Sequence, residues 1–275
     1  MIDQITLKNL KEAAKNGEPL LGCVIVSSSP ENIEIAGYLG YDFVFIDTEH
    51  APASPFGTEL ENLIRAAYAA DVTPIVRLIH NERSEIRKVL DFGAKGIVCP
   101  FMNTKAEAEK FVSECLFPPE GNRGGAPVVR ATKFGAVSWS EYVKKANEET
   151  LIIGIIERME GLRNMDEICS VKGLSGILCG PFDLAMELNI RPKGEFAVSE
   201  TLQMLTDPTI VKHVDTMIST ARRHGLVVGN IAWSAQNAVD NFKAGCHYVA
   251  LTGDNNMFIE IAKKYRDDIR RLLKQ

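Results

Sequence analysis

Eight short apolar runs recur along this chain, and their regular alternation with helical or polar segments restricts its fold more than any other feature. The runs are rich in β-branched residues and too short for typical helices, so they predict strands that are buried on both faces. The predicted strands are 19–26, 43–46, 73–77, 96–99, 151–156, 176–179, 226–231 and 248–251. Helical segments are expected over 1–12, up to Gly40, over 54–70, 82–92, 104–115 and 161–170, up to His224, over 235–244 and from about 255.

This order of elements predicts one α/β domain, a (β/α)₈ barrel that spans residues 1–275. The alternative is a doubly wound open sheet. A dinucleotide-binding sheet of that kind would need G-x-G-x-x-G after its first strand, but the turn there reads Ser27-Ser-Ser-Pro30. Two irregular segments interrupt the alternation, 117–138 and 191–195, and a loop as long as the first is usually functional.

Composition limits the partners and the compartment of the protein. The formal net charge is −5, so neither nucleic acid nor an anionic membrane is an expected partner. The amino terminus has no apolar signal segment, and no run is long enough to span a membrane. The cysteines contain no C-x-x-C pair and predict reduced core residues of a cytoplasmic protein. They are Cys23, Cys99, Cys115, Cys169, Cys179 and Cys246.

Two carboxylates end successive predicted strands. Glu157 follows 151–156, and Asp183 follows 176–179 after a Gly180-Pro181 break. The carboxyl ends of parallel strands lie on one face, where barrels bind their ligands. Taken singly, Glu157 marks where a strand reaches the surface and Asp183 caps the next helix. As a pair they favour a hard divalent ion that keeps several waters, Mg²⁺ or Mn²⁺.

Further polar side chains end the second and third predicted strands. Asp47, Glu49 and His50 follow one strand, Arg77 ends the next, and His80 lies beyond it. His50 alone could be a satisfied loop histidine, because histidine is often partly buried for packing. A guanidinium at the end of an apolar run must be paired or must bind an anion.

Some chemistry is disfavoured by what this face lacks. Lys95 precedes a strand and Lys172 lies in a loop before another, so neither suits a Schiff base inside the barrel. The G-x-S-x-G turn of a serine nucleophile is absent. What remains is metal-assisted polarisation of a carbonyl, with an arginine facing the developing oxyanion and a histidine moving a proton.

Several motifs in order and spacing resemble the class II pyruvate aldolases of the 4-hydroxy-2-oxoheptanedioate aldolase family. That group includes the 2-dehydro-3-deoxyglucarate and 2-keto-3-deoxy-rhamnonate aldolases. The resemblance covers about residues 22–258. The motifs that carry it are 42–52 (DFVFIDTEHAP), 76–77 (VR), 90–94 (LDFGA), 118–124 (PPEGNRG), 156–157 (IE) and 180–184 (GPFDL).

The resemblance implies a barrel whose last helix is exchanged between subunits of a homohexamer, a trimer of dimers. It implies that Glu157 and Asp183 hold Mg²⁺ or Mn²⁺, with Co²⁺ or Zn²⁺ as alternatives. The ion would chelate pyruvate, and the segment Gly180-Pro181-Phe182-Asp183 would contact this substrate.

The same resemblance assigns roles to the other polar residues. Arg77 would neutralise the enolate oxygen, and His50 would move the proton of the 4-hydroxyl. Asp91 would raise the basicity of His50, although the sequence alone places Asp91 in solvent at a helix end, where a carboxylate is unfavourable. Asp47 and Glu49 would orient metal-bound waters and His50.

Two departures from the family pattern bear on the substrate. Ile155 stands where the family often has glutamine, and Phe182 stands where it often has a small residue. The expected function is cleavage of a 4-hydroxy-2-oxo acid to pyruvate and an aldehyde. The aldehyde pocket is expected from the loops after the second and fourth strands, from 118–130 and from a neighbouring subunit. A lyase acting on a CoA thioester and a non-catalytic metal or 2-oxo-acid binding protein are the alternatives.

Overall fold

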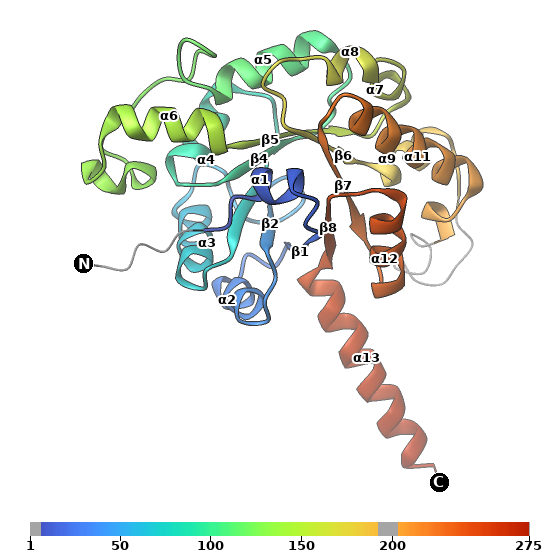
Figure 1. Ribbon diagram of the computed structural model, residues 1–275. Helices are drawn as coiled ribbons and strands as arrows, with labels where there is room; N and C mark the ends of the chain where they lie inside the picture. Colours follow the sequence, from blue (N-terminus) through green and yellow to red (C-terminus); the bar gives the residue numbers. More distant parts are fainter. Residues whose placement is uncertain (1–6, 192–202, 275) are drawn as a thin grey trace.

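Eight parallel strands close into a barrel in the computed structural model, which describes residues 7–191 and 203–274 (Figure 1). Each strand pairs with the next along the chain, and β8 pairs with β1. The predicted (β/α)₈ barrel is thereby confirmed. The strands are β1 Leu20–Ile25, β2 Phe43–Asp47, β3 Thr73–Arg77, β4 Gly96–Cys99, β5 Leu151–Ile156, β6 Gly176–Cys179, β7 Val227–Ala232 and β8 Tyr248–Gly253.

Helices cover the outside of the strands and agree with most predicted ranges. The predicted helix 1–12 is wrong over 7–9, which are not helical, because α1 begins only after its N-cap Asn9; residues 1–6 lie outside the described part. The predicted helix 161–170 is two short helices, because Asn164 between them has a non-helical backbone. The segment 117–138 contains a 3₁₀ turn, Arg130–Gly135, and residues 192–195 lie outside the described part. The helices are α1 Leu10–Lys15, α2 Pro30–Tyr38, α3 Thr58–Ala69, α4 Arg83–Asp91, α5 Lys105–Cys115, α6 Trp139–Glu149, α7 Met159–Arg163, α8 Met165–Cys169, α9 Pro181–Glu187, α11 Pro208–Arg223, α12 Ala235–Ala244 and α13 Asp254–Leu272.

The barrel interior is filled by large side chains, and glycines on neighbouring strands make room for them. Phe43 and Tyr248 meet edge to face with ring centroids 6.1 Å apart. A Cβ added at Gly22 would lie 2.2 Å from the Phe43 ring, and one added at Gly229 would lie 2.1 Å from the Tyr248 ring. The interior is therefore a packed core, so ligands have access only at the strand ends.

All six cysteines are buried and unpaired, as predicted for reduced core residues. None of the helices within the described ranges combines the length and the apolar character needed to cross a membrane.

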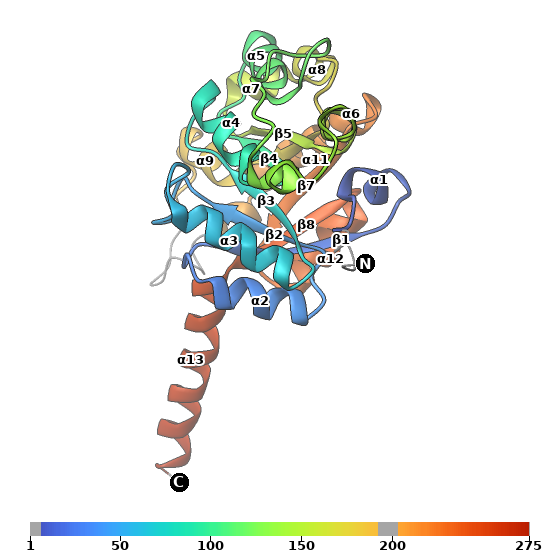
Figure 2. The ribbon, with the colours of Figure 1, turned by 90° about the vertical axis from the view of Figure 1, so that its left-hand side faces the viewer.

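The last helix, α13, projects away from the barrel in two perpendicular views (Figures 1 and 2). None of its residues is buried, and Phe258, Tyr265 and Ile269 are 72%, 62% and 57% exposed. Asp254 fixes its first turn, since Asp254 Oδ1 accepts hydrogen bonds from the backbone N–H groups of Val26 and Ser27. An exposed apolar face of this kind usually packs on another chain. Exchange of α13 between subunits stays a prediction that this exposure favours.

Candidate active site

Arg77 and Asp47 form the centre of the polar cluster at the carboxyl ends of β2 and β3. The register of the two strands places these residues opposite each other. Asp47 accepts hydrogen bonds from two guanidinium nitrogens of Arg77, the one from Nε measuring 3.1 Å, and its side chain is 3% exposed. Burial opposes the charge of Asp47, but Arg77 and two backbone N–H groups hold its pKa below the usual range. The predicted need of Arg77 for a charged partner is met inside the site.

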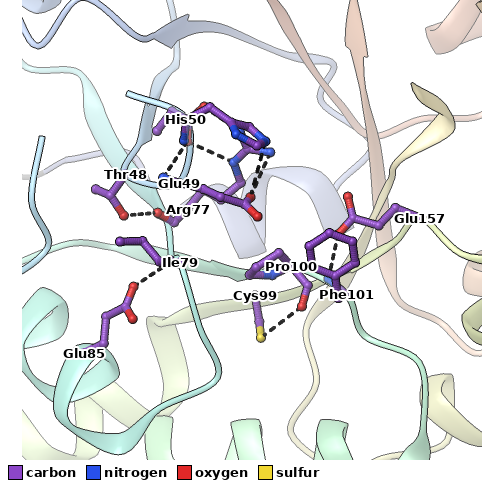
Figure 3. A network of polar contacts seen from close by, with 11 residues as sticks. Thr48, Glu49, His50, Arg77, Ile79, Glu85, Cys99, Pro100, Phe101 and Glu157 are labelled. Atoms are coloured by element: carbon purple, nitrogen blue, oxygen red, sulfur yellow. Dashed lines mark hydrogen bonds and ion pairs between the residues drawn. The ribbon is translucent and has the colours of Figure 1, made fainter. Parts of the chain in front are cut away.

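The turn after β2 is built on the same aspartate. Asp47 Oδ1 accepts hydrogen bonds from the backbone N–H groups of Glu49 at 2.9 Å and of His50 at 3.1 Å. The Glu49 carboxylate thereby lies 3.3 Å from Arg77 Nη1, and 4.0 Å from His50 Nε2 (Figure 3). The His50 side chain is 68% exposed, so its imidazole can exchange protons with solvent or a ligand. Asp47 thus orients both Arg77 and the segment that carries His50.

Glu157 is the most buried carboxylate of the cluster after Asp47. It follows β5, is 4% exposed, and accepts one hydrogen bond of 2.6 Å at Oε1 from the backbone N–H of Phe101 (Figure 3). The pKa of Glu157 is raised to about 7, first by burial and then by the negative charges of Asp183 and Glu49, while the Phe101 N–H and Arg77 act in the opposite direction. A buried carboxylate under such repulsion is poised to gain a cation.

Gly180 brings the chain after β6 into direct contact with Glu157. The N–H of Gly180 donates to the carbonyl of Ile156 at 2.9 Å, and an added Cβ would lie 2.3 Å from the Cβ of Glu157. Only a glycine permits this approach. Gly180 is also the N-cap of α9, so the alternative that Asp183 caps this helix is wrong.

Asp183 is the third residue of α9 and is half-buried. Its carboxylate forms no hydrogen bond or ion pair within 7–191 and 203–274, yet it interacts electrostatically with both Glu157 and Glu49. Pro181 before it is buried, and the Phe182 ring is 43% exposed. Asp183 therefore has its oxygens free for a ligand.

The donor set fits a hard divalent cation better than a structural metal. Oxygen ligands suit Mg²⁺ and Mn²⁺, and a cation between Glu157 and Asp183 would relieve the repulsion that raises the pKa of Glu157. In the described part of the chain, no three His, Cys, Asp or Glu side chains are arranged to hold a metal ion. A cation held by these two carboxylates would thus keep most coordination positions for water or substrate.

Asp91 is not brought to His50 within one subunit. It ends α4, whose carboxyl end lies at the amino-terminal end of the strands, and it pairs with Arg123 at 3.0 Å. Its side chain is 17% exposed, so the interpretation of Asp91 as a solvated residue is also wrong. Among the described residues no hydrogen bond or ion pair links Asp91 to His50. Asp91 therefore makes no contact through which it could raise the basicity of His50 within one subunit.

The loop 118–130 runs along the outer helices, from Asn122, whose carbonyl accepts from Arg83 at the start of α4, to Arg130 beyond the end of that helix. Arg123 donates to Tyr142 as well as to Asp91, and an added Cβ at Gly93 would lie 3.3 Å from Arg130. Among the described residues, no hydrogen bond or ion pair joins the loop to the polar cluster, so its expected part in an aldehyde pocket stays a prediction. Lys95 is also placed as predicted: burial lowers its pKa, but it precedes β4, far from the polar cluster.

Phe101 is a part of the site that the sequence analysis missed. Its backbone is left-handed, with φ of 50°, and this conformation directs its N–H to Glu157. The side-chain amide of Asn103 donates to the Phe101 carbonyl at 3.0 Å and holds the turn. No residue pattern signals this contact, because a backbone donor can belong to any residue type.

Comparisons with known proteins agree with the barrel fold. Residues 20–260 match the HpcH/HpaI aldolase/citrate lyase family. A 5-keto-4-deoxy-D-glucarate aldolase of Escherichia coli O139:H28 is 30% identical over 271 residues, 98% of this chain and 100% of the relative.

Two solved structures are similar over almost their whole length. The citrate synthase SbnG has a TM-score of 0.83 at 28% identity, covering 99% of this chain and 100% of that chain. A HpcH/HpaI aldolase/citrate lyase family protein from Burkholderia cenocepacia J2315 has a TM-score of 0.84 at 26% identity, covering 95% of this chain and 98% of that chain. The chain therefore belongs to the HpcH/HpaI aldolase/citrate lyase family and is a carbon–carbon lyase.

Proposed function

We propose that this enzyme is a divalent-metal-dependent aldolase that cleaves or forms a 4-hydroxy-2-oxo acid, with pyruvate and an aldehyde as the other reactants. The observation that carries the proposal is the approach of the buried Glu157 to Asp183 across Gly180, beside the paired Arg77. A bound Mg²⁺ or Mn²⁺ would supply Lewis acidity towards the oxygens of the 2-oxo acid. The 5-keto-4-deoxy-D-glucarate aldolase relative supports this substrate class.

The positions of Arg77, His50 and Asp47 suggest a separate role for each in the proposed reaction. Arg77 lies at the centre of the cluster with its guanidinium oriented by Asp47 and Glu49, which suits it to stabilise the oxygen of the pyruvate enolate. His50 carries an exposed imidazole beside Glu49 and is suited to take the proton of the 4-hydroxyl during cleavage and return it during condensation. Asp47 positions both groups through hydrogen bonds from each.

We also propose that the protein is a homo-oligomer, a hexamer built as a trimer of dimers, in which α13 packs on a neighbouring subunit. The apolar side chains on α13 support this assembly, because each lies in solvent in a single chain.

The test is exchange of the pyruvate methyl protons in D₂O, followed by NMR with Mg²⁺ or Mn²⁺ and again after EDTA. Glu157→Ala should abolish metal-dependent exchange, and Glu160→Ala, an exposed carboxylate on α7, should leave it unchanged. Exchange needs no knowledge of the aldehyde. Its absence in the wild type with every metal would refute the pyruvate proposal and favour the alternative of a lyase acting on a CoA thioester.

His50 is tested by turnover instead of exchange. His50→Ala should lose aldol cleavage, measured by coupling pyruvate release to lactate dehydrogenase. Unchanged turnover would remove His50 from the proposed proton transfer.

A further inference from the structure

Arg158 is a second guanidinium beside the proposed metal ligands, and the proposed function gives it no role. It directly follows Glu157 at the carboxyl end of β5 and is exposed. Its guanidinium forms no hydrogen bond or ion pair with any residue that the structure describes; it makes a cation–π contact with the Phe101 ring, 5.0 Å from the centroid. Arg77, by contrast, is occupied by two carboxylates. Arg158 thus keeps its N–H groups free for a ligand.

The turn that holds Glu157 also carries the aromatic ring under this guanidinium. The Phe101 N–H donates to Glu157, and the Phe101 carbonyl accepts from Asn103, so both sides of the left-handed residue are held. Such a backbone conformation persists in a large residue only when its surroundings enforce it. A guanidinium stacked on an aromatic face leaves its edge N–H groups pointing outwards. The guanidinium of Arg158 thus lies over a ring whose own backbone N–H donates to Glu157.

The charges around the reacting centre make this cation significant. Glu49, Glu157 and Asp183 interact electrostatically with one another, so an anionic group that approached them without a facing cation would be repelled. Ile155, two residues before Glu157 on β5, is 2% exposed and offers no polar group to a substrate. Among the described residues that follow β5, Arg158 offers N–H groups that no carboxylate occupies.

We propose that Arg158 binds an anionic group on the aldehyde half of the substrate, a carboxylate or a phosphate, and so determines which aldehydes are used. Both anions accept two parallel hydrogen bonds from the planar guanidinium. The inference rests on the proposed aldolase function and adds to it a specificity-determining residue. The substrates are then 4-hydroxy-2-oxo acids that carry a second anionic group beyond the bond that is cleaved.

The test compares aldehydes matched in length and differing in charge, with pyruvate as the common partner. The ratio of kcat/KM for succinic semialdehyde to kcat/KM for butanal is measured for the wild type, Arg158→Gln, Arg158→Lys and Arg163→Gln. Glyceraldehyde 3-phosphate and glyceraldehyde form the second pair and distinguish a phosphate from a carboxylate. Arg163 is a matched control, because it is an exposed arginine five residues further along, on α7.

Arg158→Gln should lower this ratio by roughly tenfold to a hundredfold for the pair whose anion is bound, as expected for loss of a charge-assisted pair of hydrogen bonds. Arg158→Lys should restore part of the ratio, and Arg163→Gln should leave it unchanged. Three results would each overturn the inference: an equal loss of kcat/KM for charged and neutral aldehydes in Arg158→Gln, no loss of kcat/KM, or the same fall of the ratio in Arg163→Gln. Pyruvate exchange in the wild type is measured in parallel. If exchange is present and the ratio does not change, only the role of Arg158 fails; if exchange is absent, the aldolase proposal itself fails.

Discussion

Replacing Glu157 by glutamine should stabilise the metal-free protein strongly at pH 8 and by only about a quarter as much at pH 5. Glu157 is 4% exposed and its folded-state pKa is raised from 4.5 to about 7, first by burial and then by Asp183 and Glu49. The amide oxygen of glutamine can still accept the Phe101 N–H, so the substitution removes the charge and keeps the hydrogen bond. The perturbation therefore isolates the electrostatic cost of the buried carboxylate.

The sign follows from proton binding in the two states. Below pH 4.5 the carboxyl is protonated both in the folded and in the unfolded chain, and it carries no penalty. As the pH rises towards 7, the unfolded chain releases the proton while the folded chain keeps it, so the free energy of unfolding falls. The pKa difference of about 2.5 pH units, from 4.5 to about 7, corresponds to about 3 kcal/mol that is lost above pH 7.

The measurement is urea unfolding with EDTA at pH 5, 6, 7 and 8, followed by circular dichroism at one protein concentration, because oligomer stability depends on concentration. Glu160→Gln, an exposed carboxylate three residues away, is the matched control and should follow the wild type. Adding Mn²⁺ at pH 8 should stabilise the wild type more than Glu157→Gln. Equal stabilities of the wild type and Glu157→Gln at pH 8, or a difference that is the same at pH 5, would refute the reasoning.

Two further predictions address the glycine contact and the last helix. Gly180→Ala should weaken Mn²⁺ binding at least tenfold, measured by electron paramagnetic resonance. The added Cβ would lie 2.3 Å from the Cβ of Glu157, so Glu157 must move by about 1 Å. Gly124→Ala is the control, because an added Cβ there meets only Arg87 at 3.8 Å. Equal Mn²⁺ affinities for the two variants would contradict the role of Gly180. A chain ending at Asn256 should sediment as a smaller species than the full chain, since it lacks the exposed apolar face of α13, and an unchanged mass would exclude α13 from the assembly.

The sequence by itself determined the barrel and one end of it as the site. Eight apolar runs rich in β-branched residues, each followed by a helix or loop, can bury both faces of a parallel sheet in few ways. All eight strands of the structure begin and end within two residues of their expected bounds. Because all strands run in parallel, the residue that ends each run must lie at the same end of the barrel. Asp47, Arg77 and Glu157 could therefore be grouped from their positions in the chain alone.

Only the tertiary structure decided which groups touch within and around that site. The Phe101 N–H reaches Glu157 across 56 residues through a left-handed backbone that no side-chain pattern encodes, and the Phe101 ring lies under the Arg158 guanidinium. The pairing of Asp91 with Arg123 likewise depends on how a long loop folds back, since the position of Asp91 at a helix end leaves its partner open. Periodicity reports which face of α13 is apolar but not what covers it. These features depend on loop conformation and on packing between distant segments, whereas strand order and strand ends follow from local pattern.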